Sequence, residues 1–334
     1  MAGDTHPAVS VQAGSHAAQA GQRNPNKVIC VGHSALDRVF AVSAWPQASA
    51  KVVATSYAEI GGGMAANAAV AVARLGGTAA FWGPVGEDSI ADSMREQLQA
   101  EGVDVRGLRR FSGLQSSTSA ILIDARGERL VVGYRGSALA APADWLAVDE
   151  IAAAGAVLAD VRWPQGASAA LRAARRAGVP GVLDGDTAER AALLALTQEA
   201  EYALFSESGL ACFSDAAAIE TGLRQALALG VRLAAVTQGE QGTLWLEAGS
   251  AGALQHLPAY PVPVVDTLAA GDVFHAAFAL ELARGKASVA ALRFASAAAA
   301  IKCTRPGGRA GCPTRAEVER FLDLNAASPG SAQR

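Results

Sequence analysis

Short apolar runs alternate with Ala- and Leu-rich segments of helical periodicity along most of this 334-residue chain. The apolar runs lie at 28–31, 79–82, 156–159, 179–183, 202–205 and 233–237, and clear helical patterns lie at 65–75, 90–100 and 167–177. Strands covered on both faces are apolar throughout, and parallel strands need helical crossovers. The alternation therefore predicts an α/β/α sandwich with a mostly parallel central sheet.

Two stretches, at about 38–60 and 112–136, replace this alternation with β-branched runs. In the second stretch, Ser117 to Asp124 and Glu128 to Tyr134 flank the turn Ala125-Arg126-Gly127, as the two strands of a hairpin do. We expect these strands to form a small β-sheet lid. Such a lid would exclude water from a reacting group beneath it.

The string VVDTLAAGDVF at 264–274 joins a β-branched run to an apolar helical pattern that continues to Ala283. The first turn of a helix has unpaired N–H groups and a partial positive charge, so it attracts anions. The small residues Ala269, Ala270 and Gly271 would let a phosphate approach these amides. The string predicts an anion site.

Asp272 is unexpected in this turn, because a carboxylate repels a phosphate held by the same amides. Its presence is explained if it accepts the proton of a hydroxyl group that attacks the phosphate. The alternative is that Asp272 caps the N-terminus of a buried helix, a role that aspartate often fills. The residues of the turn alone leave both interpretations open.

The pattern DTxAAGDxF resembles the D-T-x-G-A-G-D-x-F signature of the ribokinase family, also called phosphofructokinase-B-type carbohydrate kinases. The resemblance implies that Asp272 is the catalytic base, that the amides of Ala269, Ala270 and Gly271 form the anion hole, and that Thr267 lies at the nucleotide. Ala269 stands where the family usually has glycine. This turn must therefore avoid a positive φ or tolerate some strain.

A second landmark is the string GGGMAAN at 61–67, which leads into an Ala-rich helical pattern. Glycines before a helix let ligand hydroxyls reach the main chain, and the G-x-G-x-x-G spacing of a dinucleotide site is missing. The resemblance implies that the sugar contacts Gly61, Gly62, Gly63, Asn67 and Asp37. Without the resemblance, Asp37 would be assigned to an ordinary turn.

Two further strings follow the family's order along the chain. GPVGED at 83–88 fits its G-x-V-G-x-D turn, and TQGEQG at 237–242 fits its T-x-G-x-x-G nucleotide loop. Gly-rich loops are often only turns, but the resemblance implies a nucleotide site at Thr237, Gly239, Gly242, Gly308 and Gly311. The resemblance covers residues 27 to 325.

The resemblance implies ATP and Mg²⁺ as cofactors, with a monovalent cation such as K⁺ as a further candidate. The family's N-x-x-E element, which helps to hold Mg²⁺ and phosphate, would fall at 206–209 and is not preserved. Glu207 is the candidate replacement. Because Mg²⁺ is a hard cation, phosphate oxygens and water would supply most of its ligands.

Strings outside these general motifs resemble a subgroup of the family that phosphorylates 6-deoxy-6-sulfofructose. They are LADVRW at 158–163, VLDGD at 182–186, FSESGL at 205–210 and KCTRPGGRAG at 302–311. In that subgroup a lid lysine, an arginine after a core strand and a lid asparagine hold the sulfonate. The matching positions are Lys51, Arg162 and Gly133, so the asparagine is missing.

The residue chemistry leaves alternatives for this anion site. An arginine presents a planar fork to a sulfonate or phosphate, and a lysine adds a point charge. Lys51 could instead be solvated, and Arg162 could form a structural pair with Asp160 or Asp184. Arg135 could replace the missing asparagine donor.

Composition excludes several other classes of protein. Lys and Arg number 28 against 31 Asp and Glu, and the net charge of −3 leaves no positive excess for nucleic acid or an acidic membrane. Residues 1–26 lack the basic start and apolar core of a signal peptide. The four cysteines lack metal-ligand spacing, so we expect buried, reduced thiols. These features predict a cytoplasmic protein.

We therefore expect a disordered leader at 1–26, a kinase domain at 27–325 and a disordered tail at 326–334. The expected activity is an ATP-dependent carbohydrate kinase that phosphorylates the C1 hydroxyl of a ketose with an anionic C6 group, 6-deoxy-6-sulfofructose. One alternative is a kinase for a neutral sugar, a nucleoside or a sugar phosphate, of the ribokinase, ketohexokinase or fructokinase type. Another is a non-catalytic sugar- or nucleotide-binding protein. The resemblance also implies a homodimer formed through the lid.

Overall fold

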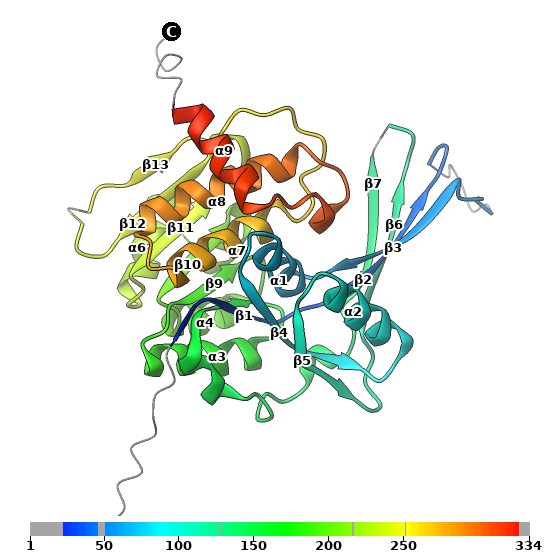
Figure 1. Cartoon of the computed structure of the whole chain (residues 1–334), viewed down its shortest axis with the longest axis horizontal. Coiled ribbons are helices and arrows are strands. Elements are labelled where there is room, and N and C mark those ends of the chain that lie inside the picture. The colour runs from blue at the N-terminus through cyan, green and yellow to red at the C-terminus, as the bar shows by residue number, and fades with distance from the viewer. Residues whose placement is uncertain (1–22, 46–50, 127, 216, 251, 327–334) are drawn as a thin grey trace, which may run out of the picture.

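The computed structural model describes residues 23–45, 51–126, 128–215, 217–250 and 252–326. These residues form a large β-sheet covered by helices on both faces and a small sheet that projects from the main body (Figure 1). The large sheet has the strand order β13-β12-β11-β10-β9-β8-β1-β4-β5. The predicted α/β sandwich with a separate lid sheet is confirmed.

The large sheet is parallel from β5 to β11 and antiparallel only at β12 and β13. The 3₁₀ turn Gly239–Gln241 joins β11 to β12. This connection is too short for a parallel crossover, so β12 is antiparallel to β11. The strands are β1 (Asn24–Val31), β4 (Thr78–Gly86), β5 (Asp104–Phe111), β8 (Ala154–Asp160), β9 (Gly181–Gly185), β10 (Tyr202–Ser206), β11 (Leu233–Thr237), β12 (Thr243–Glu247) and β13 (Gln255–Leu257).

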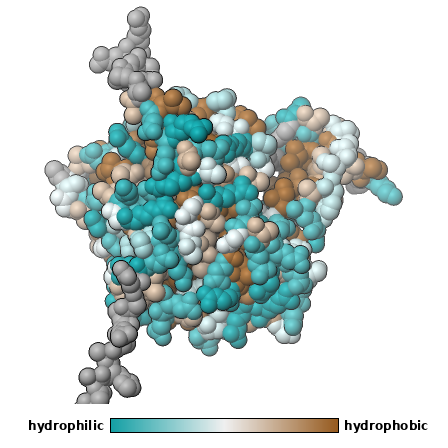
Figure 2. Space-filling model, viewed as in Figure 1, coloured by the Kyte–Doolittle hydropathy of each residue, from teal (hydrophilic) through white to brown (hydrophobic). Residues whose placement is uncertain are grey.

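The small sheet has the order β3-β2-β6-β7 and contains the predicted hairpin. Its strands are β2 (Ala35–Ala41), β3 (Ser56–Gly62), β6 (Ser117–Ile123) and β7 (Arg129–Tyr134). Figure 2 shows apolar side chains gathered on this projecting sheet. The predicted lid limits need two corrections. β2 begins at Ala35, so Asp37 lies within a lid strand, and β3 runs to Gly62, so Gly61 and Gly62 stand at the base of the lid.

Asp88, the last residue of the string GPVGED, ties the main body to the lid. Its carboxylate caps a helix by accepting a hydrogen bond from the Ala91 N–H at 2.9 Å. The same carboxylate accepts bonds from the Ser116 N–H at 2.8 Å and the Ser116 hydroxyl at 2.7 Å, directly before β6. This motif therefore fixes where the lid leaves the core.

Helices cover the two faces of the large sheet in two groups. The side chains of β1 alternate between these groups, with Val28 and Cys30 facing one and Ile29 and Val31 facing the other. The first group is α1 (Met64–Arg74), α2 (Ser89–Ala100), α7 (Ala270–Ala283), α8 (Ser288–Cys303) and α9 (Arg315–Ala326), and the second is α3 (Pro164–Ala177), α4 (Arg190–Glu199), α5 (Glu207–Phe213) and α6 (Ile219–Ala228).

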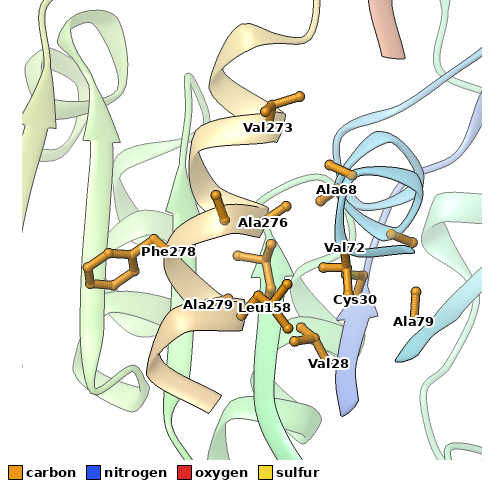
Figure 3. Packing of buried hydrophobic residues seen from close by; sticks show 14 of the residues in the cluster. Val28, Cys30, Ala68, Val72, Ala79, Leu158, Val273, Ala276, Phe278 and Ala279 are labelled. Atoms are coloured by element: carbon orange, nitrogen blue, oxygen red, sulfur yellow. The ribbon is translucent and has the colours of Figure 1, made fainter. Parts of the chain in front are cut away.

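The packing of α1 against α7 positions the candidate site. Helix α1 buries mainly small side chains, and Figure 3 shows Ala68 and Val72 of α1 in one cluster with Val273 and Ala276 of α7. Alanine faces let helix backbones approach closely, because only methyl groups separate them. The N-terminal turns of these two helices are therefore held side by side.

The ends of the domain differ slightly from the predicted limits. β1 begins at Asn24, which pairs with Ala154, so residues 24–26 belong to the domain and not to a leader. At the other end, α9 includes Ala326, so the predicted tail begins one residue too early. The expectations for residues 1–22, 46–50 and 327–334 lie outside the described residues. None of the described helices is long and apolar enough to cross a membrane. Among the cysteines, Cys30 and Cys312 are buried, and Cys212 and Cys303 are half-buried; all are free thiols.

Candidate active site

Asp272 lies in the first turn of α7, where the side chain of Asn67 on α1 contacts it. The Asn67 Nδ2–H donates a hydrogen bond to Asp272 Oδ2 at 2.8 Å. Within the described residues, Asn67 Oδ1 is buried without a partner and can accept a hydrogen bond from a ligand. Asn67 therefore both orients the Asp272 carboxylate and offers an acceptor beside it.

The environment of Asp272 makes its carboxylate unusually basic. Burial raises its pKa to about 8, and the negative charge of Asp184 acts in the same direction. The hydrogen bond from Asn67 and the nearby His275 oppose this rise. A carboxyl group with a pKa near neutrality can accept a proton from a hydroxyl group far better than an ordinary aspartate.

Two buried carboxylates that the sequence analysis did not assign to the site stand behind Asp272. Asp184, at the end of β9, lies 3.4 Å from His275 Nδ1, and burial raises its pKa well above the ordinary value. Asp160, at the end of β8, accepts hydrogen bonds from the backbone N–H groups of His33, Ala65 and Arg162. Both lie at the carboxyl ends of parallel strands, where ligands bind in such sheets. This position could have indicated them from the sequence.

The turn before α7 is strained at Ala269. Its φ of 64° makes it the one non-glycine residue with positive φ in the described part of the chain. An alanine in this left-handed conformation costs about 1–2 kcal/mol. The turn thus keeps its positive φ, and alanine in place of the family's glycine is tolerated at the cost of strain.

The amides of this turn are not all available to a ligand. The Ala270 N–H, predicted to belong to the anion hole, donates to the Thr267 carbonyl at 3.1 Å. The Gly271 N–H has no acceptor among the described residues, and a Cβ at Gly271 would meet no atom within 4 Å. The open space at Gly271 leaves its amide accessible to an anion.

A cavity of about 500 Å³ borders this turn and gathers most of the predicted nucleotide residues. Thr237, Gly239, Gly242, Thr267, Ala270 and Gly271 lie on its wall, together with apolar side chains such as Tyr260 and Phe274. Gly308 and Gly311 do not. They are buried in the 3₁₀ turn Gly308–Gly311, where the Gly308 N–H donates to Asp266 at 3.2 Å.

Asp37 and the glycines of GGGMAAN lie where the lid meets the core. The Ser119 hydroxyl donates to Asp37 Oδ1 at 2.5 Å, and a Cβ at Gly62 would lie 2.4 Å from Asp37 Oδ2. Gly63 has φ of 91° and caps α1. Glycine is therefore required at Gly62 to let the Asp37 carboxylate lie against the β3 backbone.

Arg309 is a buried cation beside the predicted sugar residue Gly61, and the sequence analysis did not single it out. Its guanidinium is buried against Gly61, where a Cβ would lie 1.8 Å from Nη2. Its hydrogen bond within the described residues goes to the neutral side chain of Gln97, at 3.1 Å. Burial lowers the pKa of Arg309, and the negative charges of Glu101 and, more weakly, Asp37 oppose this. The string KCTRPGGRAG contained this residue, but only the fold brings it to the lid.

No contact within the described residues joins Lys51 and Arg162, the two residues predicted for the sulfonate, or brings either to Gly133, where the expected asparagine is missing. The Arg162 guanidinium bonds Asp186 Oδ2 and the Thr187 carbonyl, both at 2.6 Å, so its ion-pair partner is neither Asp160 nor Asp184. Lys51 is exposed in the segment before β3, and Gly133 is exposed on β7.

His33 is a further polar group at this junction. Its Nε2 is buried without a partner among the described residues, and burial lowers its pKa to about 4. The charges of Arg162, Asp37 and Arg135 all act on its ring. A neutral imidazole with an unused nitrogen therefore stands near the Asp37 side of the site.

The described residues contain no cluster of three or more His, Cys, Asp or Glu side chains that could hold a metal ion. Glu207, the candidate Mg²⁺ ligand, is exposed at the start of α5 and accepts a hydrogen bond from Gln238 Nε2 at 3.0 Å. The described residues around Glu207 therefore offer no ready-made set of protein ligands for a metal ion.

This fold is an α/β sandwich with a lid of strands, and its cavity lies at the start of α7, the helix that carries the Asp272 carboxylate. These features define the class of ribokinase-like small-molecule kinases. The chain belongs to the pfkB family of carbohydrate kinases, whose family model matches residues 25–315. The predicted family resemblance is confirmed.

Known proteins of this family resemble the chain over most of its length. Ribokinase of Bacillus subtilis is 33% identical over 306 residues, which cover 88% of this chain and 99% of the relative. A fructokinase of Klebsiella pneumoniae is 32% identical, covering 78% and 91%. The structure of Arabidopsis thaliana ribokinase with ribose and ATP is 25% identical, with a TM-score of 0.78 over 89% of this chain and 98% of that one.

An Escherichia coli structure of this fold contains ATP and Mg²⁺. It is 21% identical, with a TM-score of 0.77 over 90% of this chain and 99% of that one.

Proposed function

We propose that this chain transfers the γ-phosphoryl group of ATP to the C1 hydroxyl of a ketose that carries an anionic group at C6, with 6-deoxy-6-sulfofructose as the preferred substrate. The observation that carries the kinase assignment is the Asp272 carboxylate, which Asn67 holds at the mouth of the helix turn beside the cavity. Family membership supports the same reaction.

Asp272 acts as the general base. It accepts the proton of the attacking hydroxyl as the oxygen bonds to phosphorus, and the bond from phosphorus to the ADP oxygen breaks. The pKa of about 8 makes this transfer favourable near neutral pH. Asn67 keeps one carboxylate oxygen occupied, so the other faces the substrate.

The start of α7 stabilises the transferred group. The free amide of Gly271 and the positive end of the helix dipole attract the equatorial phosphoryl oxygens. The cavity wall at Thr237, Gly239 and Gly242 holds the nucleotide through its exposed main chain. Mg²⁺ offsets the charge of the phosphates, and Glu207 is the side chain closest in sequence to the family's metal element.

Arginine side chains support an anionic substrate. Arg309 places a buried guanidinium against Gly61, and its hydrogen bond within the described residues goes to the neutral side chain of Gln97. Arg162 and Arg135 add positive charge beside His33. Lys51 is exposed close to β3 and could reach the sugar when the lid closes. We infer that these groups bind the sulfonate, with Asp37 binding sugar hydroxyls.

A kinase for a neutral sugar is the second candidate. The ion pair of Arg162 with Asp186 favours it, because a neutralised arginine attracts an anion less strongly. The similarity to ribokinases and fructokinases also favours it. In that case Arg309 would orient Asp37 instead of binding a substrate anion.

A panel of sugars distinguishes the two candidates. We expect ATP turnover to have a higher kcat/KM with 6-deoxy-6-sulfofructose than with fructose, ribose or fructose 6-phosphate. Replacing Arg309 by Met should raise KM for the anionic sugar by about 10- to 100-fold, because a charge-assisted hydrogen bond contributes about 1.5–3 kcal/mol. Arg172→Met, at an exposed arginine of α3, is the matched control. Preference for a neutral sugar would contradict the anionic assignment.

Asp272→Asn tests the kinase assignment itself. We expect kcat to fall by about 10²- to 10⁴-fold, which is the usual contribution of a general base. A variant within tenfold of the parent protein would remove Asp272 from this role and leave the capping interpretation.

We also infer a cytoplasmic homodimer. Exposed apolar side chains of the lid, among them Tyr57, Val131 and Val132, support association through this sheet. A cytoplasmic location accords with the free cysteines and with a requirement for ATP.

A further inference from the structure

Lys302 is a fully buried lysine that the proposed reaction does not use. It lies in the last turn of α8, and none of its side chain is exposed to solvent. A buried ammonium group is costly unless other groups replace its water shell. The contacts of Lys302 Nζ therefore show what this charge does.

Oxygen atoms from two loops surround Lys302 Nζ. It donates to the Asp266 carbonyl at 2.7 Å and to the Arg305 carbonyl at 3.4 Å, and it lies 3.3 Å from Asp266 Oδ2. Main-chain carbonyl and carboxylate oxygens are also the ligands that replace the hydration shell of K⁺ and other hard cations. The ammonium thus sits in an oxygen cage of the kind that a monovalent cation would occupy.

The cage belongs to the turn that leads to Asp272. Asp266 Oδ1 accepts a hydrogen bond from the Leu268 N–H at 2.9 Å, inside that turn. Asp266 Oδ2 accepts bonds from the Gly307 and Gly308 N–H groups at 3.0 and 3.2 Å. Lys302, through Asp266, therefore joins the end of α8, the turn before α7 and the Gly307–Gly308 loop.

The orientation of one peptide group follows directly from this contact. The peptide between Asp266 and Thr267 is planar and trans, so its carbonyl and N–H point in opposite directions. Because Lys302 holds the carbonyl, the Thr267 N–H is turned away from the ammonium, and Thr267 lies on the cavity wall. A positive charge at Nζ thus fixes the main chain that borders the cavity.

We propose that the Lys302 ammonium is a built-in monovalent cation, which positions the turn at 266–272 and makes phosphoryl transfer independent of K⁺. The candidate cofactor K⁺ does not fit between this turn and the Gly307–Gly308 loop, because the lysine head group fills that position. Lys302 is a positioning residue, since it acts through Asp266 and Thr267. This inference rests on phosphoryl transfer but not on the identity of the sugar.

The wild-type protein gives the first test. We expect kcat/KM for the best sugar of the panel and the melting temperature to be the same in potassium chloride and in N-methylglucamine chloride. Stimulation of the wild type by K⁺ of more than about threefold, or a K⁺-specific rise in its melting temperature, would overturn the proposal. The melting measurement needs no turnover, so it stays informative even if the proposed substrate is wrong.

Lys302→Ala gives the second test, because it removes the charge and opens space for an ion. In N-methylglucamine chloride we expect kcat to fall by about 10²-fold or more, comparable to the loss of one anion-hole donor. K⁺ or NH₄⁺ should restore at least a tenth of the lost activity and should raise the melting temperature of this variant. Li⁺, which binds fewer and closer oxygens, should do neither.

Two matched variants complete the design. Lys302→Met keeps most of the side-chain volume without the charge, so neither K⁺ nor NH₄⁺ should rescue it. Lys286→Ala removes an exposed lysine that follows α7 and should behave as the wild type. A Lys302→Ala protein that folds, loses activity and shows no response to K⁺ or NH₄⁺ would contradict the cation role. If this variant does not fold, the wild-type salt comparison alone decides.

Discussion

The side-chain amide of Asn67 bonds the carboxylate of Asp272 at 2.8 Å and connects the first turns of α1 and α7. These residues are separated by 205 positions in the sequence. The contact links the string GGGMAAN, which leads from the lid into α1, to the string that begins α7. The Asp272 carboxylate and the end of the lid at α1 therefore share one support, and displacement of either helix would disturb both.

The raised pKa of Asp272 predicts the pH dependence of catalysis. Asp272 must be ionised to accept a proton, so kcat/KM should fall as the pH is lowered through about 8. Asp184→Asn removes a negative charge that raises this pKa, so the midpoint of the pH profile should move to lower pH. Asp215→Asn, at an exposed position, is the control. An unchanged midpoint in Asp184→Asn would exclude the charge coupling.

The raised pKa of Asp272 also predicts how the free energy of unfolding changes with pH. The folded protein holds the Asp272 proton more tightly than the unfolded chain does, because the folded-state pKa of about 8 exceeds the ordinary value of 3.8. The contribution of Asp272 to the free energy of unfolding should therefore fall as the pH rises from about 4 to about 8. Asp272→Asn should remove this dependence, as measured by urea unfolding at several pH values.

Ala269→Gly should stabilise the protein. Glycine adopts the φ of 64° without the Cβ clash, so we expect the free energy of unfolding to rise by about 1 kcal/mol. Ala287→Gly is the matched control, because Ala287 also precedes a helix but has φ of −63°. Urea unfolding of both variants measures the difference. A loss of stability in Ala269→Gly as large as in Ala287→Gly would show that the turn is not strained.

Gly62→Ala should impair sugar binding while leaving the nucleotide cavity intact. The new Cβ would lie 2.4 Å from Asp37 Oδ2 and push this carboxylate away from the lid base. Displacement of a substrate-positioning group by about 1 Å can cost about 10²-fold, so kcat/KM for the sugar should fall by roughly that factor. ADP affinity, measured by calorimetry, should stay unchanged. Ser56→Ala on the same strand is the control, and a similar loss there would indicate general damage to β3.

Val132→Lys should separate the proposed dimer. Val132 is 61% exposed on the edge strand β7, and a lysine there would place a charge in the proposed interface. Light scattering after gel filtration should report a monomer for this variant and a dimer for the parent. Val289→Lys, at an exposed valine of α8, should remain dimeric. A monomeric parent protein would contradict association through the lid.

The alternating apolar and helical patterns were sufficient to predict the parallel sheet, because strands buried on both faces consist almost entirely of apolar residues. They did not predict β5 or β13, whose partly exposed sequences carry weaker patterns, nor β12, which is mostly buried but only five residues long. The motif strings located Asp272, Asn67 and Asp37, since each occupies a fixed place before or within a helix or strand. They could not show that Asn67 contacts Asp272.

The local sequence thus determined most of the strands and helices and located the candidate turn at 266–272, because periodicity and small residues act over a few positions. Only the tertiary structure decided which distant side chains meet. It buried Arg309 against Gly61, paired Arg162 with Asp186 and enclosed Lys302 between two loops. Each of these outcomes depends on the desolvation of a charge by elements far apart in the chain, and desolvation is a property of the packed fold.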